Sequence, residues 1–576
     1  IDPERGIVTA TVTVGKDDEP AEVAVGAGGV WVANRQAATV ARIVPARAAV
    51  DPTLELGSAP QGLAIVDGAL WVSVTGGGSA HRGGTLRLVD AAAAVSSELD
   101  PAYSYGEPTL NEATRDGLMT LRRSAGTSYG VPIPNLAVAH PEVSDGGRTY
   151  TFTIRRGIRF SDGRPLRPSD LAYSLNRAAR TGQGGQILDT VARARADDAA
   201  GTVTLHLEQP DPEILYKLTT GFGSVVPQGS GKPPVKRPLP ATGPYRVTKF
   251  TSGRGYRLER NPYFKVWSAA ARPDGYPDAI TKVVTDTEAG VRRVARGAAD
   301  VLTLPHLAQM TKRLPELRRR YGERLHTFAP AGTQWFFMNV DMPPFDDVRA
   351  RRAVLLGLDR RAILRRQGGE SGARLTCRII PPTLAGHDES PCPYPEQPDL
   401  ARARRLVRAS GTRGMRVTVL TGDPAFTANS EVLVKTLRRI GHRPTDRNQP
   451  IGAYFEGILN RPRHDGHIGT MGWYADYPSP SNFILPLFRC GRPPANSNVG
   501  HYCDRQLDAL ARRAQRLQIS RPEEANRLWA AADRRIVERA AAAPLTNGVN
   551  HFLVSERVAN FQAGTFSPRF DQLWVR

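Results

Sequence analysis

The stretch GWYADYPSPSNF, residues 472–483, brings two large aromatic side chains and one carboxylate together. Trp473 and Tyr474 stand just before Asp476, and a Pro-Ser-Pro run then prevents a helix or a central strand from continuing. A carboxylate beside aromatic faces can hold a cation that has left water, because a buried ammonium group needs a charge-assisted partner. The alternative is structural, with Trp473 in a core and Asp476 capping the turn.

The familiar catalytic patterns are absent from the sequence. There is no H-E-x-x-H and no G-x-S-x-G motif, and QGSGKPP around Lys232 has Pro233 where a phosphate loop needs Ser or Thr. His464 and His467 form H-D-G-H, in which Gly466 would interrupt the helical geometry of a metal site. We therefore expect both histidines to face solvent in a turn, with metal binding as the alternative. The sequence therefore predicts no catalytic residue, metal or cofactor.

The four cysteines fall into two close pairs, Cys377 with Cys392 and Cys490 with Cys503. Neither pair has the C-x-x-C spacing of a zinc or redox site. Because His501 stands close to Cys503 in the sequence, a metal site is the alternative interpretation. Two even pairs that close short loops favour disulfides in an oxidising compartment, each contributing on the order of 3 kcal/mol. We therefore expect the chain to lie outside the cytoplasm.

Chain length and net charge indicate the number of domains and the kinds of partner. A chain of 576 residues should divide into about three or four domains. Lys and Arg exceed Asp and Glu by 77 to 56, a net charge of +21, but the arginines are scattered on amphipathic segments, which indicates solvated helix faces. We expect no nucleic-acid partner; peripheral contact with a membrane surface stays open. Because the sequence begins at Ile1 without a leader, we expect an extracellular or cell-surface protein whose N-terminal leader or anchor has been removed, with a piece of a longer chain as the alternative.

The first hundred residues contain a repeat. EPAEVAVGAGGVWVANR recurs as APQGLAIVDGALWVSVT, and the tryptophans Trp31 and Trp71 lie 40 residues apart. Alternating apolar residues and Gly-containing turns predict antiparallel strands. A period near 40 with one tryptophan per unit resembles a YVTN-like β-propeller blade. Two blades cannot close a ring, so we expect an incomplete propeller, with a small independent sheet as the alternative.

From about residue 99, strand patterns alternate with amphipathic helix patterns. Five blocks occur here in a fixed order: LDPAYSYGEPTLNEATRDGLM, PNLAVAHPEVSDGGRTYTFTIRRGIRFSDGRPLRPSDLAYSLNRA, ATGPYRVTKF with LERNPYF, MPPFDDVRARRAVLLGLDRRAIL, and GWYADYPSPSNF. Together they resemble the extracellular solute-binding proteins of ABC transporters, family 5, which bind oligopeptides, dipeptides or nickel.

The resemblance implies an α/β fold of the two-lobed periplasmic-binding-protein type II, or Venus flytrap, kind. We expect lobe I at 96–325, lobe II at 326–540 and a C-terminal return to lobe I at 541–576, after an all-β, propeller-blade-like segment at 1–95. Two strands should cross between the lobes. The ligand should bind the closed arrangement of the lobes better than the open one and so shift the balance toward closure.

The resemblance also implies the ligand-binding residues. In peptide-binding relatives the aspartate of the last block pairs with the ligand's α-ammonium group, which by position is Asp476, with Trp473 and Tyr474 beside it. Further candidates are Tyr103, Tyr105, Glu107, Trp335, Asn339 and Phe222. In the strand TQWFFMNV only one parity can face a ligand, and for the two tyrosines packing under a loop is an equal alternative.

Two functions follow from the resemblance. The first is extracellular capture of a small solute by a monomer that delivers it to an ABC-transporter permease. An oligopeptide is the solute that we expect first. The second is a ligand-sensing domain of a larger, membrane-anchored regulatory protein, which the N-terminal repeats favour. A secreted hydrolase, the third class, lacks a catalytic constellation.

Overall fold

The computed structural model describes most of the chain. The described residues are 8, 10–12, 14, 20–34, 39–56, 60–74, 81–91, 99–103, 108–121, 132–232, 235, 237–268, 270–304, 308–423, 426–493, 496–518, 520–561 and 567–576. They divide into two compact units, which we call unit 1, residues 1–302 with 554–576, and unit 2, residues 303–553. The chain passes from one to the other twice, within strands β17 (Val301–Leu304) and β25 (Asn550–Val554).

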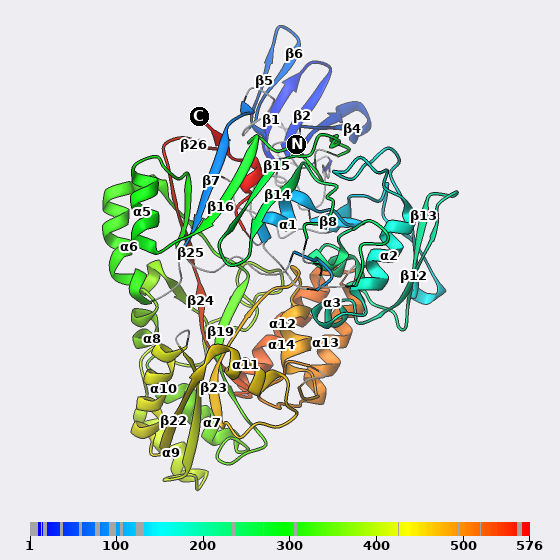
Figure 1. Ribbon diagram of the computed structural model, residues 1–576. Coiled ribbons are helices and arrows are strands. Elements are labelled where there is room, and N and C mark those ends of the chain that lie inside the picture. Colours follow the sequence, from blue (N-terminus) through cyan, green and yellow to red (C-terminus); the bar gives the residue numbers. More distant parts are fainter. Residues whose placement is uncertain are drawn as a thin grey trace. The chain divides into compact units, whose positions relative to one another are not determined.

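The sequence repeat folds as two equivalent hairpins (Figure 1). Strands β1 (Pro20–Gly26) and β2 (Gly29–Asn34) pair in the same register as β5 (Pro60–Val66) and β6 (Ala69–Val74). Trp31 lies opposite Ala24, and Trp71 lies opposite Ala64. Both turns have two residues with positive φ, 46° and 76° in the first and 52° and 78° in the second, which suits right-twisted hairpins.

The repeats build small sheets and not a propeller. Strands β1 and β2 continue into β3 (Thr39–Val44) and β4 (Ala49–Glu55), giving an antiparallel sheet in chain order, whereas β5 and β6 form a two-stranded sheet. The hairpins touch where the Leu63 amide donates to Glu22 Oε2 at 2.9 Å. The predicted all-β N-terminal segment is thus present, but the described residues form no ring of blades.

Unit 1 otherwise contains two larger sheets. In one, strands lie in the order β14 (Tyr245–Thr251), β15 (Gly255–Arg260), β16 (Ala279–Val284), β7 (Thr85–Asp90) and β17, with β7 parallel to β16. The other has the order β10 (Glu142–Ser144), β11 (Thr149–Thr153), β13 (Thr202–Leu207), β12 (Val191–Asp197). The remaining elements are α1 (Pro108–Thr114), α2 (Pro168–Ala178), α3 (Gly182–Ile187), α4 (Ile214–Lys217), α5 (Thr287–Ala295), the pair β8 (Met119–Leu121) and β9 (Pro132–Pro134), and the pair β26 (Val558–Ala559) and β27 (Trp574–Val575).

Unit 2 is built on a mixed sheet with helices around it. Its strand order is β20 (Ala373–Leu375), β24 (Ala542–Gly548), β19 (Gly332–Met338), β23 (Ile468–Tyr474), β21 (Arg416–Asp423), β22 (Arg443–Pro450). Strand β18 (Leu325–Phe328) pairs with β25. The helices are α6 (Ala308–Tyr321), α7 (Val348–Gly357), α8 (Arg360–Arg366), α9 (Leu400–Ala409), α10 (Thr427–Ile440), α11 (Ile451–Leu459), α12 (Ser481–Phe488), α13 (Arg505–Leu517) and α14 (Pro522–Glu538). Apolar residues of α7, α9 and α10 share one core with β19 and β21.

Aspartates cap the first turns of α7 and α8. Asp347 accepts from the Arg349 amide at 2.7 Å, and Asp359 accepts from the Ala362 amide at 2.8 Å. Asp359 Oδ2 also lies 4.0 Å from Arg365 Nη2. Arg351, in α7, is buried and donates to the Phe345 carbonyl at 2.7 Å.

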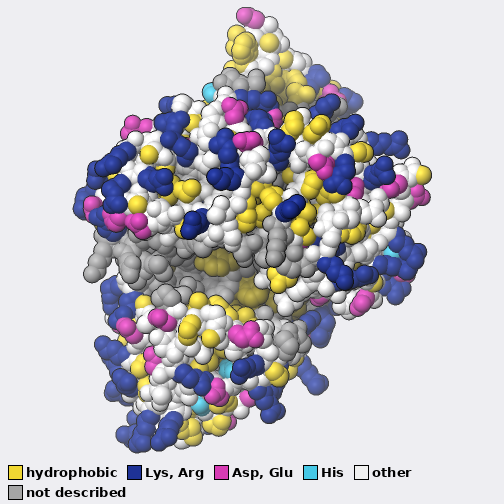
Figure 2. Space-filling view, in the orientation of Figure 1, with side chains coloured by type: hydrophobic (Ala, Val, Ile, Leu, Met, Phe, Trp, Pro, Cys, Tyr) yellow, Lys and Arg dark blue, Asp and Glu magenta, His cyan; other side chains and the backbone are white. Residues whose placement is uncertain are grey.

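The basic side chains do not gather in one place on the face that Figure 2 shows. Lys and Arg are spread over it and interspersed with Asp and Glu. This distribution is that of a solvated surface, as the sequence predicted. Among the described residues, no helix is both long enough and apolar enough to cross a membrane.

Candidate functional site

The turn after β23 holds the aromatic and acidic residues of the GWYADYPSPSNF block. Strand β23 lies between β19 and β21, and it ends at Tyr474. The chain stays tied to the sheet for one more residue, because the Ala475 amide donates to Ala331 O at 2.8 Å. Helix α12 then begins at Ser481. A rigid sheet and a helix start therefore position the turn from both sides.

Asn482, in the first turn of α12, organises this site. Its Oδ1 accepts from the Trp473 indole Nε1 at 3.0 Å and from the Asp476 backbone amide at 2.9 Å. Its Nδ2 donates to Asp476 Oδ2 at 2.8 Å. Asn482 is only 3% exposed, so these bonds are shielded from water. One buried amide thus fixes both the indole ring and the carboxylate, a role that the sequence reasoning missed.

Tyr474 presents an aromatic surface beside them. It is 54% exposed, and its ring lies against Gly332 at the start of β19. A Cβ at Gly332 would come within 2.4 Å of Tyr474 Cδ1, so this position has to be glycine to keep the ring in place. Trp473 and Asp476 are partly exposed. The site can thus offer a fixed carboxylate and two aromatic side chains to a ligand carrying a positive charge.

The other predicted ligand residues lie in different surroundings. Tyr103 is 43% exposed in unit 1, whereas Phe222 is 1% exposed in the unit 1 core. Trp335 is buried and its ring lies 6.3 Å from Phe488, and Asn339 Nδ2 faces the Gly466 carbonyl at 3.4 Å. These three buried side chains have packing roles in the structure. Tyr105 and Glu107 lie outside the described residues.

Gln334 and Trp335 are neighbours in β19 and lie on opposite sides of the strand, and Asn339 follows its last residue. Gln334 Oε1 accepts from Gln367 Nε2 at 3.0 Å and from Asn429 Nδ2 at 3.2 Å. The side-chain oxygen of Gln334 therefore accepts two hydrogen bonds from residues of unit 2.

One of the two predicted disulfides is formed. Cys490 and Cys503 are bonded, 13 residues apart in sequence. Cys377 and Cys392 are thiols in the structure, each close to an arginine: Arg378 Nη1 lies 3.3 Å from Cys377 Sγ, and Arg360 Nη1 lies 3.1 Å from Cys392 Sγ. The predicted disulfide between Cys377 and Cys392 is therefore wrong for this structure.

The histidines of the H-D-G-H segment are not the solvent-facing residues that we expected. His464 is half-buried, and its Nε2 lies 2.8 Å from Val499 O. His467 is also half-buried, and its Nδ1 accepts from the Thr418 amide at 3.1 Å. Burial lowers the pKa of both rings, which favours their neutral forms. Within the described residues, no group of His, Cys, Asp and Glu has the arrangement of a metal site.

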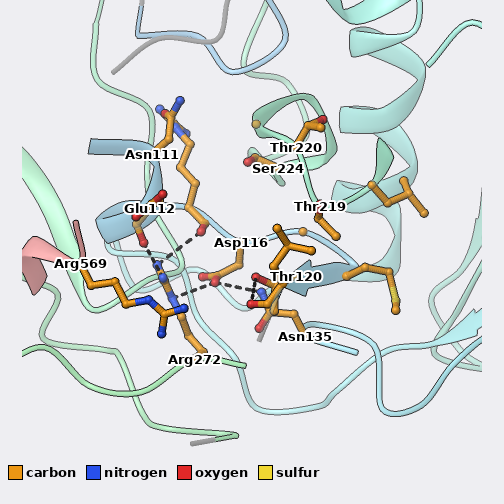
Figure 3. Close-up of a pocket in the computed structure, with 16 residues that line it drawn as sticks. Asn111, Glu112, Asp116, Thr120, Asn135, Thr219, Thr220, Ser224, Arg272 and Arg569 are labelled. Atoms are coloured by element: carbon orange, nitrogen blue, oxygen red, sulfur yellow. Dashed lines mark hydrogen bonds and ion pairs between the residues drawn. The ribbon is translucent and has the colours of Figure 1, made fainter. Parts of the chain in front are cut away.

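Unit 1 contains a cavity of about 140 Å³ that the sequence gave no sign of. Its walls come from α1, β8 and the segment 218–224 (Figure 3). Asp116 anchors one side, accepting from Asn135 Nδ2 at 3.1 Å and Thr242 Oγ1 at 2.7 Å and pairing with Arg272 Nε at 2.8 Å. Thr219, Thr220 and Ser224 lie across from Arg569 in the same view.

The chain is similar to solute-binding proteins of known families. Residues 131–494, more than half of the chain, match the family model described as bacterial extracellular solute-binding proteins, family 5. A probable di/tripeptide-binding protein 5 of Pseudomonas aeruginosa is 24% identical over 82% of this chain and 93% of its own length. A dipeptide-binding protein of Escherichia coli is 22% identical over 66% and 74%. The solved structure of clavulanic acid biosynthesis oligopeptide binding protein 2 superposes with a TM-score of 0.74 at 26% identity, covering 87% of this chain and 96% of that one.

Proposed function

Because the chain belongs to the bacterial extracellular solute-binding proteins of family 5, we propose that its solute is a short peptide with a free amino terminus. The relatives named for dipeptides, for di- and tripeptides and for oligopeptides support this class of ligand. The observation that carries the proposal is the Asp476 carboxylate, which Asn482 holds beside Trp473 and Tyr474.

The chemistry of an α-ammonium group fits these residues. A compact cation that leaves water needs a carboxylate within hydrogen-bond reach, and aromatic faces attract it further. Holding Asp476 in place before binding reduces the ordering cost that the ligand would otherwise meet. Asn482 does so through a backbone bond and a side-chain bond to the same residue. The turn is therefore prepared for a positive group before any ligand arrives.

Calorimetry with trialanine and N-acetyltrialanine tests the proposal. We expect Asp476→Ala to weaken trialanine binding by about 2 to 5 kcal/mol, as loss of one partner of a desolvated charge pair does. Acetylation should weaken binding to wild type by a comparable factor. Asp465→Ala, which removes an exposed aspartate that pairs with Arg447, is the control and should leave affinity unchanged. Equal trialanine affinity in wild type and Asp476→Ala would remove this carboxylate from the site.

Transport is the accompanying proposal. The members of this family are components of ABC transporters and not enzymes, and we propose that this chain works outside the cytoplasm as a monomer that delivers its peptide to a permease. The disulfide between Cys490 and Cys503 supports an oxidising location. Uptake of a labelled peptide by cells with and without the protein tests delivery.

The N-terminal hairpins favour a second candidate, ligand sensing within a larger regulatory protein. Their equal register over a 40-residue repeat shows that the same β-hairpin unit occurs twice before the first strand of the binding fold, which supports a part of the chain with its own role. In that arrangement the bound ligand is reported to other domains of the same chain. The complete gene product discriminates the two: a lipid-attachment cysteine supports transport, and a membrane-spanning helix with a cytoplasmic domain supports sensing.

A further inference from the structure

Arg115, directly after α1, lines the unit 1 cavity with most of its hydrogen-bonding capacity unused. The side chain is 6% exposed. Its Nη2 donates to Leu99 O at 2.8 Å, but Nε and Nη1 are buried and have no partner among the residues that the structure describes. A buried guanidinium normally satisfies its donors, so two missing partners on one side chain call for an explanation.

The nearby carboxylates do not supply those partners. The charge of Asp100 acts on Arg115, but Arg177 binds this carboxylate through both of its Nη atoms, one at 2.6 Å. Asp116 pairs with Arg272. Among the residues that line the cavity, three arginines stand against two carboxylates, which leaves a surplus positive charge: Arg115, Arg272 and Arg569 against Glu112 and Asp116. Burial is also the main reason why the pKa of Arg115 is lowered to about 10, with Arg177 lowering it further and Asp100 opposing both.

We propose that the unit 1 cavity is a binding site for a small monocarboxylate, which supplies the missing partner of Arg115. A carboxylate satisfies both needs at once, because it accepts from guanidinium donors and neutralises the surplus charge. The cavity of about 140 Å³ has room for the carboxylate and a short side chain and not for a long peptide. Either a free carboxylic acid or the C-terminal residue of a peptide offers this chemistry.

The inference does not rest on the proposed ammonium site, because Asp476 is in unit 2 and every wall residue of the cavity is in unit 1. N-acetylalanine is therefore a suitable probe: it carries a carboxylate and no ammonium group. Its amide, N-acetylalaninamide, is the matched ligand without charge. Titration of the full chain, monitored by ligand-observed NMR, measures the affinity for each of the two ligands.

We expect wild type to bind N-acetylalanine at least tenfold more tightly than the amide, and Arg115→Gln to remove that preference. Gly221→Leu is a second variant that fills the cavity without changing Arg115. A Cβ at Gly221 would lie 3.6 Å from Asn111 Nδ2, which is an ordinary contact distance. Gly182→Leu, at a position with open space around its Cβ and outside the cavity, is its control and should bind normally. Asp476→Ala should also bind N-acetylalanine normally, even if the ammonium site fails its own test.

The arms of the experiment separate the two sources of the carboxylate. In the Asp476→Ala background, trialanine that binds more tightly than N-acetylalanine identifies a peptide C-terminus, and equal or weaker binding identifies a free acid. The proposal is overturned if wild type shows no preference for the acid over the amide at millimolar concentrations. It is also overturned if Gly221→Leu, with a normal melting temperature, keeps the preference.

Discussion

Removal of the Asn482 side chain is the sharpest test of how the aromatic and acidic turn is held. Asn482→Ala deletes one acceptor that serves Trp473 Nε1 and the Asp476 amide, and one donor to Asp476 Oδ2. All three partner groups then lose a bond inside a site where the deleted side chain is 3% exposed. The variant adds no bulk, so its effect measures the loss of this network.

The expected cost follows from the number of bonds. Three shielded hydrogen bonds at about 1 kcal/mol each give a destabilisation of about 3 kcal/mol. For a unit of this size, that corresponds to a fall in melting temperature of roughly 6 to 12 °C. Affinity for trialanine should fall as well, by about 1 to 2 kcal/mol, because Asp476 has to be ordered when the ligand binds.

Asn498→Ala is the matched control for this variant. Asn498 is also buried in unit 2, and its Nδ2 donates to Arg489 O at 3.0 Å and Tyr502 O at 2.6 Å. Its loss should lower the melting temperature comparably while trialanine affinity stays at the wild-type value. Scanning calorimetry measures the first quantity and titration calorimetry the second. If Asn482→Ala and Asn498→Ala affect affinity equally, Asn482 does not position the ligand site.

Two further predictions concern stability. Replacing Cys490 and Cys503 together by serine should lower the free energy of unfolding by about 3 kcal/mol, because the bond closes a loop with a separation of 13 residues; chemical denaturation in oxidising buffer checks it, and an unchanged midpoint contradicts it. Burial lowers the pKa of His442 from 6.5 to about 4, so the unfolded chain takes up a proton first and stability falls as pH drops from about 6.5 to 4, by up to about 3 kcal/mol. His442→Gln should flatten the stability curve over that window, and an equal slope in wild type and variant would refute the assignment.

The sequence predicted those features that local signals determine. The two hairpins followed from alternating apolar residues and Gly-containing turns. The order of the family blocks indicated the two-lobed fold, which the family match supports. The turn around Asp476 was recognisable because its aromatic residues and prolines are neighbours in the chain.

Features that depend on contacts between distant segments could not be predicted from the sequence. Asn482 gave no signal of its own, because its role depends on how α12 returns toward the end of β23. The cavity joins residues near 115, 220 and 570, which no spacing rule connects. The burial of Trp335 and the inward position of His464 likewise depend on tertiary packing, which overrides an amphipathic or turn-like local pattern.

Two buried arginines show what separates a structural cation from a candidate binding residue. Arg351 is 7% exposed and Arg115 is 6% exposed, so burial does not distinguish them. Arg351 donates from Nε to Ala540 O at 3.0 Å, from Nη1 to Phe345 O at 2.7 Å and from Nη2 to Arg539 O at 3.2 Å. Within the part of the chain that the structure describes, Arg115 makes one such bond. Since a guanidinium in the interior is stabilised by its partners, Arg351 has the contacts of a structural residue, and Arg115 is the arginine that we expect to bind a ligand.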